Sequence, residues 1–359
     1  MTTYLGSPNY DHHTPDRIGV LLVNLGTPDA PDTRSVRRYL SQFLSDPRVI
    51  EYPRWLWALI LHGIILRVRP ARSAHAYQQV WTDQGSPLLV NSQRLTDKLS
   101  RYLSQQLHPQ CQVVLGMSYG EPSVSRALEQ LREAQVRKLI VLPLYPHYSG
   151  STTGSVFDAV TSQLQHWRWV PALQFITQYH DDPAYIAALA NSVRQHWQTH
   201  GKQHLLLSFH GLPKRYLMNG DPYHCQCYKT GRLLAEHLHL GKEEWSVSFQ
   251  SRVGREEWLR PYTDELLLNF ASHGPKRVSV LCPGFAADCL ETIEEIALRN
   301  REDFLKAGGE AFDYIPALND SADHVELLGQ LIARHAQAWL PLSERTNSAT
   351  LAKQLGATQ

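Results

Sequence analysis

The chain has 359 residues, of which 43% are hydrophobic and 19% are charged, a balance that excludes disordered, collagen-like and low-complexity proteins. Its 35 basic and 34 acidic residues give a formal charge of +1, and the lack of a basic excess argues against general nucleic-acid binding. At about 150 residues per domain, the length predicts two domains.

Along the chain, short runs of Val, Leu and Ile alternate with longer amphipathic stretches. Such runs are typical of strands that are buried on both faces of a parallel sheet. They predict strands at 18–23, 111–116, 138–142, 204–209, 245–249 and 277–281, with weaker candidates at 172–176 and 311–315. The helical period is clearest at 88–107, 182–199, 290–306 and 322–338. This alternation predicts an α/β protein with right-handed crossovers.

Two similar sequences follow two of the predicted strands. Residues 24–28 read NLGTP and residues 209–213 read FHGLP, so each strand leads into a glycine that is followed two residues later by a proline. In this comparison Leu25 corresponds to His210. The repeat favours two similar lobes, which we place at 17–178 and 179–340, followed by a frayed polar tail at 341–359.

Ligands of open α/β sheets lie beyond the carboxyl ends of the strands. That rule selects the segments 24–29, 117–122, 143–155, 210–223 and 283–295. In a two-lobed protein, these segments are expected to meet in one cleft.

His210 directly follows a buried strand, which is a suitable position for a base or a metal ligand, although a turn histidine is the simpler interpretation. Asp288 can cap the helix that begins after it, with Glu291 completing a capping box. Glu291 and Glu295 are four residues apart, so their charges repel unless a proton or a cation lies between them. Together with His210 they form a set suited to a borderline divalent ion such as Fe²⁺.

Cysteine usage indicates a reducing, cytoplasmic compartment. The five cysteines are Cys111, Cys225, Cys227, Cys282 and Cys289, and their spacing forms no disulfide framework. Cys225 and Cys227 are poorly spaced for a metal, and no cysteine follows Cys289 that could hold an iron–sulfur cluster. The first residues lack the pattern of a signal peptide.

The most apolar stretch, 55–66, is shorter than the roughly 20 residues that span a bilayer, and it is followed by Arg67, Arg69 and Arg72. It predicts either an ordinary buried helix or an apolar lip with cations for an amphiphilic, acidic ligand. The hydroxyl-rich turn 149–155 lacks the ending of a phosphate loop, so we interpret it as a helix cap or as a turn that a flat ligand can approach.

Several of these segments together resemble the ferrochelatases. The resemblance covers roughly 18–330 and is carried by 19–28 (GVLLVNLGTP), 144–155 (LYPHYSGSTTGS), 208–213 (SFHGLP) with 220–223 (GDPY), 249–254 (FQSRVG) with Trp258 and Leu259, and 282–292 (CPGFAADCLET). It implies two Rossmann-like lobes, each a four-stranded parallel sheet flanked by helices, around a porphyrin cleft. It also implies insertion of Fe²⁺ into protoporphyrin IX to give protoheme, with release of two protons.

The resemblance also implies roles for individual residues. His210 and Glu291 match the catalytic, metal-contacting pair, and Glu295 matches the next acid along the helix. Residues that match the porphyrin pocket are Leu25, Tyr119, Tyr145, Ser149 and Trp258. Ser86 matches a position near the porphyrin carboxylates, where we also expect Arg67, Arg69 and Arg72. Whether His210 mainly accepts protons or mainly delivers iron stays open.

We expect no permanently bound cofactor, with Fe²⁺ as a substrate, and no iron–sulfur cluster. The expected partners are protoporphyrin IX and Fe²⁺, without nucleic acid, in a monomer whose residues 55–72 contact a membrane surface transiently. A related chelatase that takes another tetrapyrrole or cobalt would share the lobes and the histidine. A non-catalytic tetrapyrrole carrier would not need the paired acids.

Overall fold

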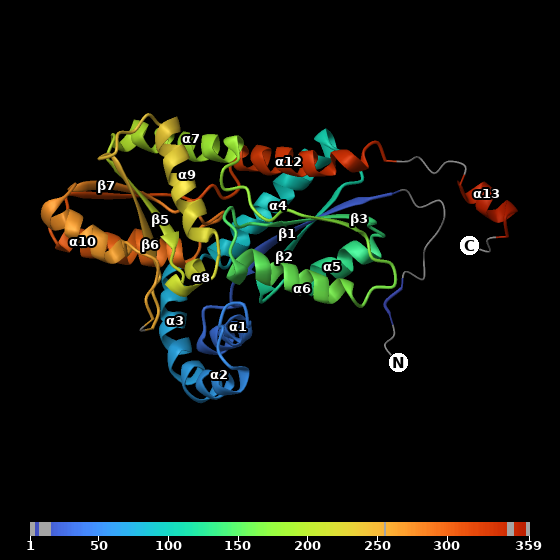
Figure 1. Cartoon of the computed structure of the whole chain (residues 1–359), viewed down its shortest axis with the longest axis horizontal. Coiled ribbons are helices and arrows are strands. Elements are labelled where there is room, and N and C mark those ends of the chain that lie inside the picture. Colours follow the sequence, from blue (N-terminus) through green and yellow to red (C-terminus); the bar gives the residue numbers. More distant parts are fainter. Residues whose placement is uncertain (1–3, 7–15, 255, 343–347, 357–359) are drawn as a thin grey trace.

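The computed structural model describes residues 4–6, 16–254, 256–342 and 348–356. Two four-stranded parallel sheets carry the fold (Figure 1). The first has the order β2-β1-β3-β4, with β1 at Ile18–Gly26, β2 at Gln112–Tyr119, β3 at Lys138–Pro143 and β4 at Ala172–Phe175. The second has the order β6-β5-β7-β8, with β5 at His204–His210, β6 at Trp245–Gln250, β7 at Arg277–Leu281 and β8 at Ala311–Ile315. The predicted fold class and all eight predicted strands are confirmed.

The first strand of each sheet has neighbours on both sides and is almost fully buried. Val20, Leu21 and Leu22 of β1 and Leu205, Leu206 and Leu207 of β5 have no exposed surface. Helices cover both faces of each sheet, which explains why these strands are continuously apolar instead of alternating.

The sequence repeat has a structural cause at the ends of these strands. Gly26 has a φ of +106°, and a Cβ there would lie 1.7 Å from the carbonyl oxygen of Tyr119 on the adjacent strand β2. A Cβ on Gly211 would lie 2.7 Å from the carbonyl oxygen of Gln250 on β6. Each lobe therefore needs glycine where its first strand leaves the sheet beside a neighbouring strand.

The helices of the first half are α1 (Thr33–Ser45), α2 (Arg54–Ile60), the π-helix η1 (Leu61–Ile65), α3 (Leu66–Val80), α4 (Pro87–Gln106), α5 (Val124–Glu133), the π-helix η2 (Gly150–Gly154) and α6 (Ser155–Leu164). Those of the second half are α7 (Pro183–His200), α8 (Lys214–Met218), α9 (Tyr223–His237), α10 (Thr263–His273), the π-helix η3 (Glu291–Asn300), α11 (Arg301–Lys306), α12 (Ala322–Ala336) and the 3₁₀ turn η4 (Gln337–Trp339). The four helices predicted most clearly are present, the third as η3 continued by α11.

The two sheets share one hydrophobic core. Its largest cluster contains Ile18 and Leu142 from the first sheet as well as Leu205 and Leu281 from the second. Helix α12 extends from the second half across to α4 of the first (Figure 1). The end of the predicted second lobe therefore packs on the first, and the boundary near 178 stays a prediction.

Helices α1, α2 and α3 project from the body of the molecule (Figure 1). Helix α2 contains no buried residue, and Trp55 is 71% exposed. The interpretation of 55–66 as an ordinary buried helix is therefore wrong, because this segment projects beyond the sheets that would have covered it. Among the described residues, no helix combines the length and the apolar character needed to span a bilayer.

The tail that was expected to fray contains a short helix, α13 (Ser348–Gln354), in which Ala, Leu, Lys and Gln favour helix formation. Residues 343–347 and 357–359 lie outside the described part of the chain.

Candidate active site

His210 is the last residue of β5 and is partly exposed there. Its Nδ1 lies 2.7 Å from the carbonyl oxygen of Gly211. Because a carbonyl only accepts, Nδ1 carries the hydrogen, and Nε2 of the neutral ring keeps its lone pair for a proton or a metal ion. The rings of Trp258 and Phe285 flank the imidazole at centroid distances of 6.5 and 6.4 Å. One nitrogen is thus fixed by a hydrogen bond, and the other is left free in an imidazole that lies near two aromatic rings.

Glu295 lies near this imidazole on η3. Its two carboxylate oxygens accept hydrogen bonds from the backbone N–H and the hydroxyl of Ser251, at 2.8 and 2.5 Å. Burial raises the pKa of Glu295, while the bonds from Ser251, the charge of Arg299 and the proximity of His210 act in the opposite direction. The structure therefore places near His210 a partly buried carboxyl group whose pKa is raised above that of an exposed glutamate.

Glu291, the first residue of η3, has different neighbours. Its charge contributes, after burial, to raising the pKa of the Tyr39 and Tyr77 phenols and of the Cys289 thiol. Tyr39 and Tyr77 belong to α1 and α3 of the first half, so Glu291 lies where the two halves meet. The i→i+5 bonding of a π-helix widens each turn, and Glu291 and Glu295 remain less than one turn apart.

The predicted capping role of Asp288 is wrong. The helix begins after Leu290 without a side-chain cap. The Asp288 carboxylate instead accepts hydrogen bonds from Thr292 Oγ1, the Tyr314 hydroxyl, and Asn319 Nδ2 at 2.7 Å. Asp288 therefore ties the start of η3 to β8 and to the loop after it, because these donors surround it in the fold.

Gln250, at the end of β6, lies within the motif 249–254 but is not among the predicted site residues. Its buried side chain accepts a hydrogen bond from the Ser208 hydroxyl at 2.7 Å and donates one to the carbonyl oxygen of Glu291 at 2.9 Å. Its backbone carbonyl accepts from Gly211 N–H at 2.8 Å. One residue therefore connects the strand that carries His210 with the helix that carries both glutamates. The signal in the sequence was a polar residue at the end of a buried strand.

Trp258 is positioned by Tyr262, which in turn contacts Arg252 and Arg260. Its backbone N–H lies 3.3 Å from the hydroxyl of Tyr262, which accepts from it. The Tyr262 ring in turn lies 4.2 Å from the guanidinium of Arg252 and 4.3 Å from that of Arg260. The indole Nε1 is buried and has no hydrogen-bond partner among the described residues.

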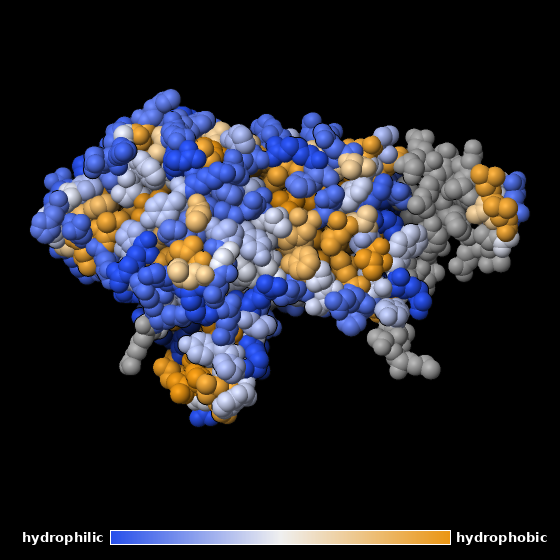
Figure 2. All heavy atoms as spheres, in the orientation of Figure 1, coloured by the Kyte–Doolittle hydropathy of each residue, from blue (hydrophilic) through white to orange (hydrophobic). Residues whose placement is uncertain are grey.

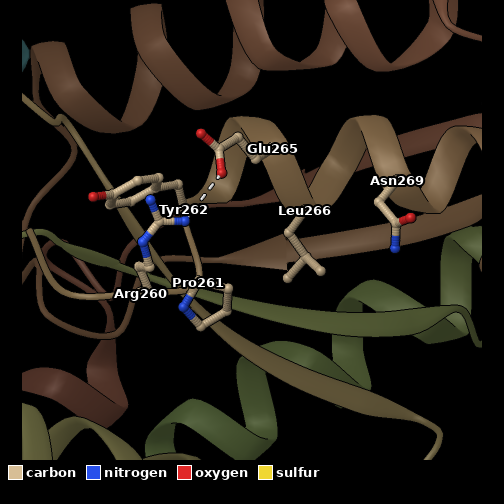
Figure 3. Close-up of a pocket in the computed structure, with 6 residues that line it drawn as sticks. All are labelled: Arg260, Pro261, Tyr262, Glu265, Leu266 and Asn269. Carbon is tan, nitrogen blue, oxygen red and sulfur yellow. Dashed lines mark ion pairs between the residues drawn. The ribbon is translucent and has the colours of Figure 1, made fainter.

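A surface hollow of about 430 Å³ lies beside these residues, lined by Arg260, Pro261, Tyr262, Glu265, Leu266 and Asn269 (Figure 3). Arg260 is paired with Glu265 across it. None of the predicted site residues lines this hollow, so it is separate from the candidate active site.

In the first half, the hydroxyl groups of the predicted pocket residues bond to the protein itself. The Tyr119 hydroxyl donates to Asp46 at 2.7 Å. The fully buried Ser149 donates to Asp221 at 2.9 Å and caps η2 by accepting from Ser151 N–H, so the interpretation of this turn as a cap is confirmed. Ser86 accepts from Thr27 at 2.8 Å and is 3% exposed. Direct contact of Tyr119, Ser149 or Ser86 with a ligand stays a prediction.

Two further residues of this half lie at the junction with the second. Leu25 packs against a small buried cluster of Leu88, Ala287 and Cys289, which joins the two halves at the ends of their sheets. Burial raises the pKa of the Tyr145 phenol, so this hydroxyl stays protonated at neutral pH.

Arg67, Arg69 and Arg72 lie at the α2 end of α3, and none of them forms an ion pair with a described residue. Tyr77, the α3 residue near Glu291, is ten residues beyond Arg67, or about 15 Å along the helix axis. Arg67 therefore lies on the projecting part of α3, whereas Arg72, five residues or about 7.5 Å before Tyr77, lies nearer to η3.

The fold defines the class of the protein. The sirohydrochlorin chelatase SirB of Bacillus subtilis subspecies spizizenii, solved in complex with cobalt, matches with a TM-score of 0.52 over 90% of this chain and 97% of that chain, at 10% identity. The two parallel sheets thus have a two-lobed, chelatase-like fold.

Sequence comparison identifies the family within this class. The ferrochelatase family model matches residues 17–336. A ferrochelatase from Nitrosococcus oceani is 56% identical over 337 residues, 94% of this chain and 91% of the relative. One from Pseudoalteromonas atlantica is 50% identical over 99% of both chains. The chain belongs to the ferrochelatase family.

The environment of Glu295 predicts a pH dependence of stability. Its folded pKa lies above the ordinary value of 4.5, so the stability linked to its proton is present below pH 4.5 and is lost as the pH rises through the folded pKa. Replacement by Gln removes this titration. In chemical denaturation, we expect Glu295→Gln to gain free energy of unfolding relative to wild type as the pH rises above 4.5.

Glu302 provides the control with the opposite sign. A hydrogen bond from Lys306 lowers the pKa of Glu302, so Glu302→Gln should gain relative stability only as the pH falls below 4.5. A difference between wild type and Glu295→Gln that does not change with pH would contradict the partly buried, proton-retaining environment of Glu295.

Proposed function

We propose that this protein inserts Fe²⁺ into protoporphyrin IX to give protoheme, and that two protons leave in the reaction. The observation that carries the proposal is the meeting of His210 with Glu295, with Glu291 on the same helix, in a chain that belongs to the ferrochelatase family. Both halves of the chain contribute to the candidate active site, because Glu291 of the second half lies near Tyr39 and Tyr77 of the first.

The reaction requires a bent porphyrin and a path for protons. The nitrogen lone pairs of a flat macrocycle point toward its centre, so the ring has to bend before a metal ion enters from one face. Contacts along the rest of the macrocycle supply that strain. In the proposal, the Trp258 ring and the apolar side chains around Leu25 and Tyr145 provide these contacts. Ser86 and the arginines Arg67, Arg69 and Arg72 serve the two carboxylates.

His210 accepts pyrrole protons through Nε2, the nitrogen left free by the hydrogen bond of Nδ1 to Gly211. Glu291 shares the metal contact with His210. Glu295, whose raised pKa suits a group that takes up and releases protons, passes them toward solvent. Nitrogen and oxygen ligands hold Fe²⁺ weakly enough for it to leave the protein with the product.

We further propose that no cofactor is bound permanently and that no iron–sulfur cluster forms. Cys227, Cys282 and Cys289 are buried, and burial raises the pKa of all three thiols, which opposes the thiolate form that a cluster needs. We also propose that the protein is a cytoplasmic monomer.

Exposed apolar side chains at the projecting tip support transient contact with a membrane surface. Trp55, Leu59, Ile64 and Val68 are between 62% and 72% exposed and lie on α2, η1 and the start of α3. Figure 2 shows an apolar patch on this projection. Arg67, Arg69 and Arg72 of α3, which form no ion pair with a described residue, add positive charge beside it. Tryptophan and basic residues around an apolar patch favour an anionic lipid surface.

The function is tested by anaerobic incubation of the purified protein with Fe²⁺ and protoporphyrin IX, followed by absorbance. We expect protoheme to form, and His210→Ala to lower the rate by about 10²–10⁴-fold, the loss typical of a positioned base. His237→Ala, a change of an exposed histidine at the end of α9, should keep the wild-type rate.

Two results would contradict the proposed function. Stable heme binding without metal insertion would indicate a carrier. Faster turnover of another tetrapyrrole or of Co²⁺ would assign the site to a different chelatase reaction.

Membrane contact is tested by flotation with vesicles of phosphatidylcholine alone and with added phosphatidylglycerol. We expect binding to the anionic vesicles, and loss of most of it when Trp55, Leu59 and Ile64 are changed to Ser, because these changes remove the apolar contact area. The control is Leu268→Ser, a change of a 45% exposed leucine on α10. Two results would contradict the lipid contact. One is a variant with all three Ser substitutions that binds the anionic vesicles as well as the wild type does. The other is a wild-type protein that is a dimer and becomes a monomer with these substitutions.

A further inference from the structure

A second set of metal-ligating side chains lies away from the candidate active site. His196 and His200 lie one turn apart at the end of α7, and Asp313 lies in the middle of β8. One ligand atom of each residue lies within 4.8 Å of those of the other two. We propose that these three side chains bind a divalent transition-metal ion such as Zn²⁺, at a site that is separate from the insertion reaction.

The spacing of the histidines follows from the helix. Residues four apart in an α-helix lie on one face, and the two imidazole rings are stacked at a centroid distance of 4.2 Å with 11° between their planes. In a tetrahedral site with bonds of about 2.1 Å, ligand atoms lie about 3.4 Å apart. A metal ion lies in the plane of each imidazole that binds it, so the two rings have to turn out of their stacked arrangement, and the ligand atoms, now within 4.8 Å of one another, have to approach, before they close around an ion.

Each histidine has a nitrogen that is available to a metal. Nδ1 of His200 lies 3.1 Å from the carbonyl oxygen of His196, so this nitrogen donates and Nε2 keeps its lone pair. Donation of the second ring N–H to a backbone carbonyl is the usual arrangement of metal-bound histidine. Nε2 of His196 is buried and has no hydrogen-bond partner among the described residues. A buried imidazole nitrogen without a partner is costly, and a metal ion would remove that cost.

Hydrogen bonds also hold the Asp313 carboxylate in place. Gln203 donates from Nε2 to Oδ2 of Asp313 at 2.5 Å, and the Oε1 of Gln203 accepts from the Ser279 hydroxyl at 3.2 Å. The Trp197 indole donates to the same hydroxyl at 3.1 Å. This chain holds Asp313 in one orientation, as expected of the layer that supports a metal ligand.

The chemistry of the set indicates which ions it takes. Two imidazoles and one carboxylate suit Zn²⁺ and the other borderline divalent ions, whereas Mg²⁺ prefers oxygen ligands alone. The carbonyl end of α7 carries a partial negative charge, which further favours a cation there.

This set lies at the opposite end of the second sheet from His210. Asp313 pairs with Ser279 on β7, and Ser279 pairs with Leu205 on β5. His210 is five residues beyond Leu205, a distance of about 17 Å along the strand. Helix α7 and the α1–α3 projection also lie on opposite sides of the molecule (Figure 1). An ion here therefore connects α7 with the edge strand β8 and stabilises the second half without contacting the porphyrin.

The test is calorimetric titration of Zn²⁺ into His210→Ala protein, in which the imidazole of the insertion site is absent. We expect one equivalent to bind, and His200→Asn to weaken binding at least about tenfold, because loss of a ligand costs no less than the 10–100-fold typical of losing a residue that supports one. His200 is exposed, so this change leaves the fold intact. Gln203→Leu should also weaken binding by about 10–100-fold, because the Asp313 carboxylate loses its support. His273→Asn, a change of an exposed histidine at the end of α10, is the matched control.

A second readout is thermal stability. Zn²⁺ should raise the Tm of the His210→Ala protein, as any ligand of the folded state does, and Mg²⁺ should not. The shift should disappear when His196 and His200 are both changed to Asn. Failure of the His210→Ala protein to bind Zn²⁺, or binding that His200→Asn leaves unchanged, would overturn the proposal. Neither result depends on the proposed insertion activity.

Discussion

The buried amide of Gln250 connects the elements on which the candidate active site depends. It accepts from Ser208 on β5 and donates to the carbonyl oxygen of Glu291 at the start of η3, while its backbone carbonyl accepts from Gly211. Leaving a buried polar group without its partner costs about 1–3 kcal/mol, so these bonds strongly favour one arrangement of β5, β6 and η3. The next residue, Ser251, holds Glu295 by two further hydrogen bonds.

This arrangement explains how chemically similar groups acquire different environments. Glu291 and Glu295 are four residues apart on one helix, yet Ser251 and His210 neighbour Glu295 while Tyr39, Tyr77 and Cys289 neighbour Glu291. The difference arises because η3 lies between the second sheet and the projecting helices of the first half. Because their neighbours differ, Glu291 can contact the metal ion while Glu295 passes protons, although the two residues are close on one helix.

Much of the fold was predictable from the sequence, because strands such as 18–23 and 204–209 are buried on both faces and are therefore continuously apolar. The position of His210 was predictable for the same reason, since it ends such a strand. The network around it was not, because the hydrogen bonds of Gln250 and Ser251 join residues about 40 apart in the sequence. Asp288 shows the same limit: its local spacing predicts a cap, but donors from Tyr314 and Asn319 surround it in the fold.

The most direct test of this account is steady-state iron insertion by Gln250→Met, which keeps the approximate volume of the side chain and removes its hydrogen bonds with Ser208 and Glu291 as well as the longer one from Cys282. Ser208→Ala is the matched comparison, because it removes one bond to the same amide and leaves the bond to Glu291. The account predicts that Gln250→Met lowers kcat at least about tenfold with little change in the KM for porphyrin, since Glu291 loses the support that positions it for the transition state. Ser208→Ala should keep kcat near wild type. A Gln250→Met protein that loses stability but keeps its kcat would contradict the claim that this amide organises the site.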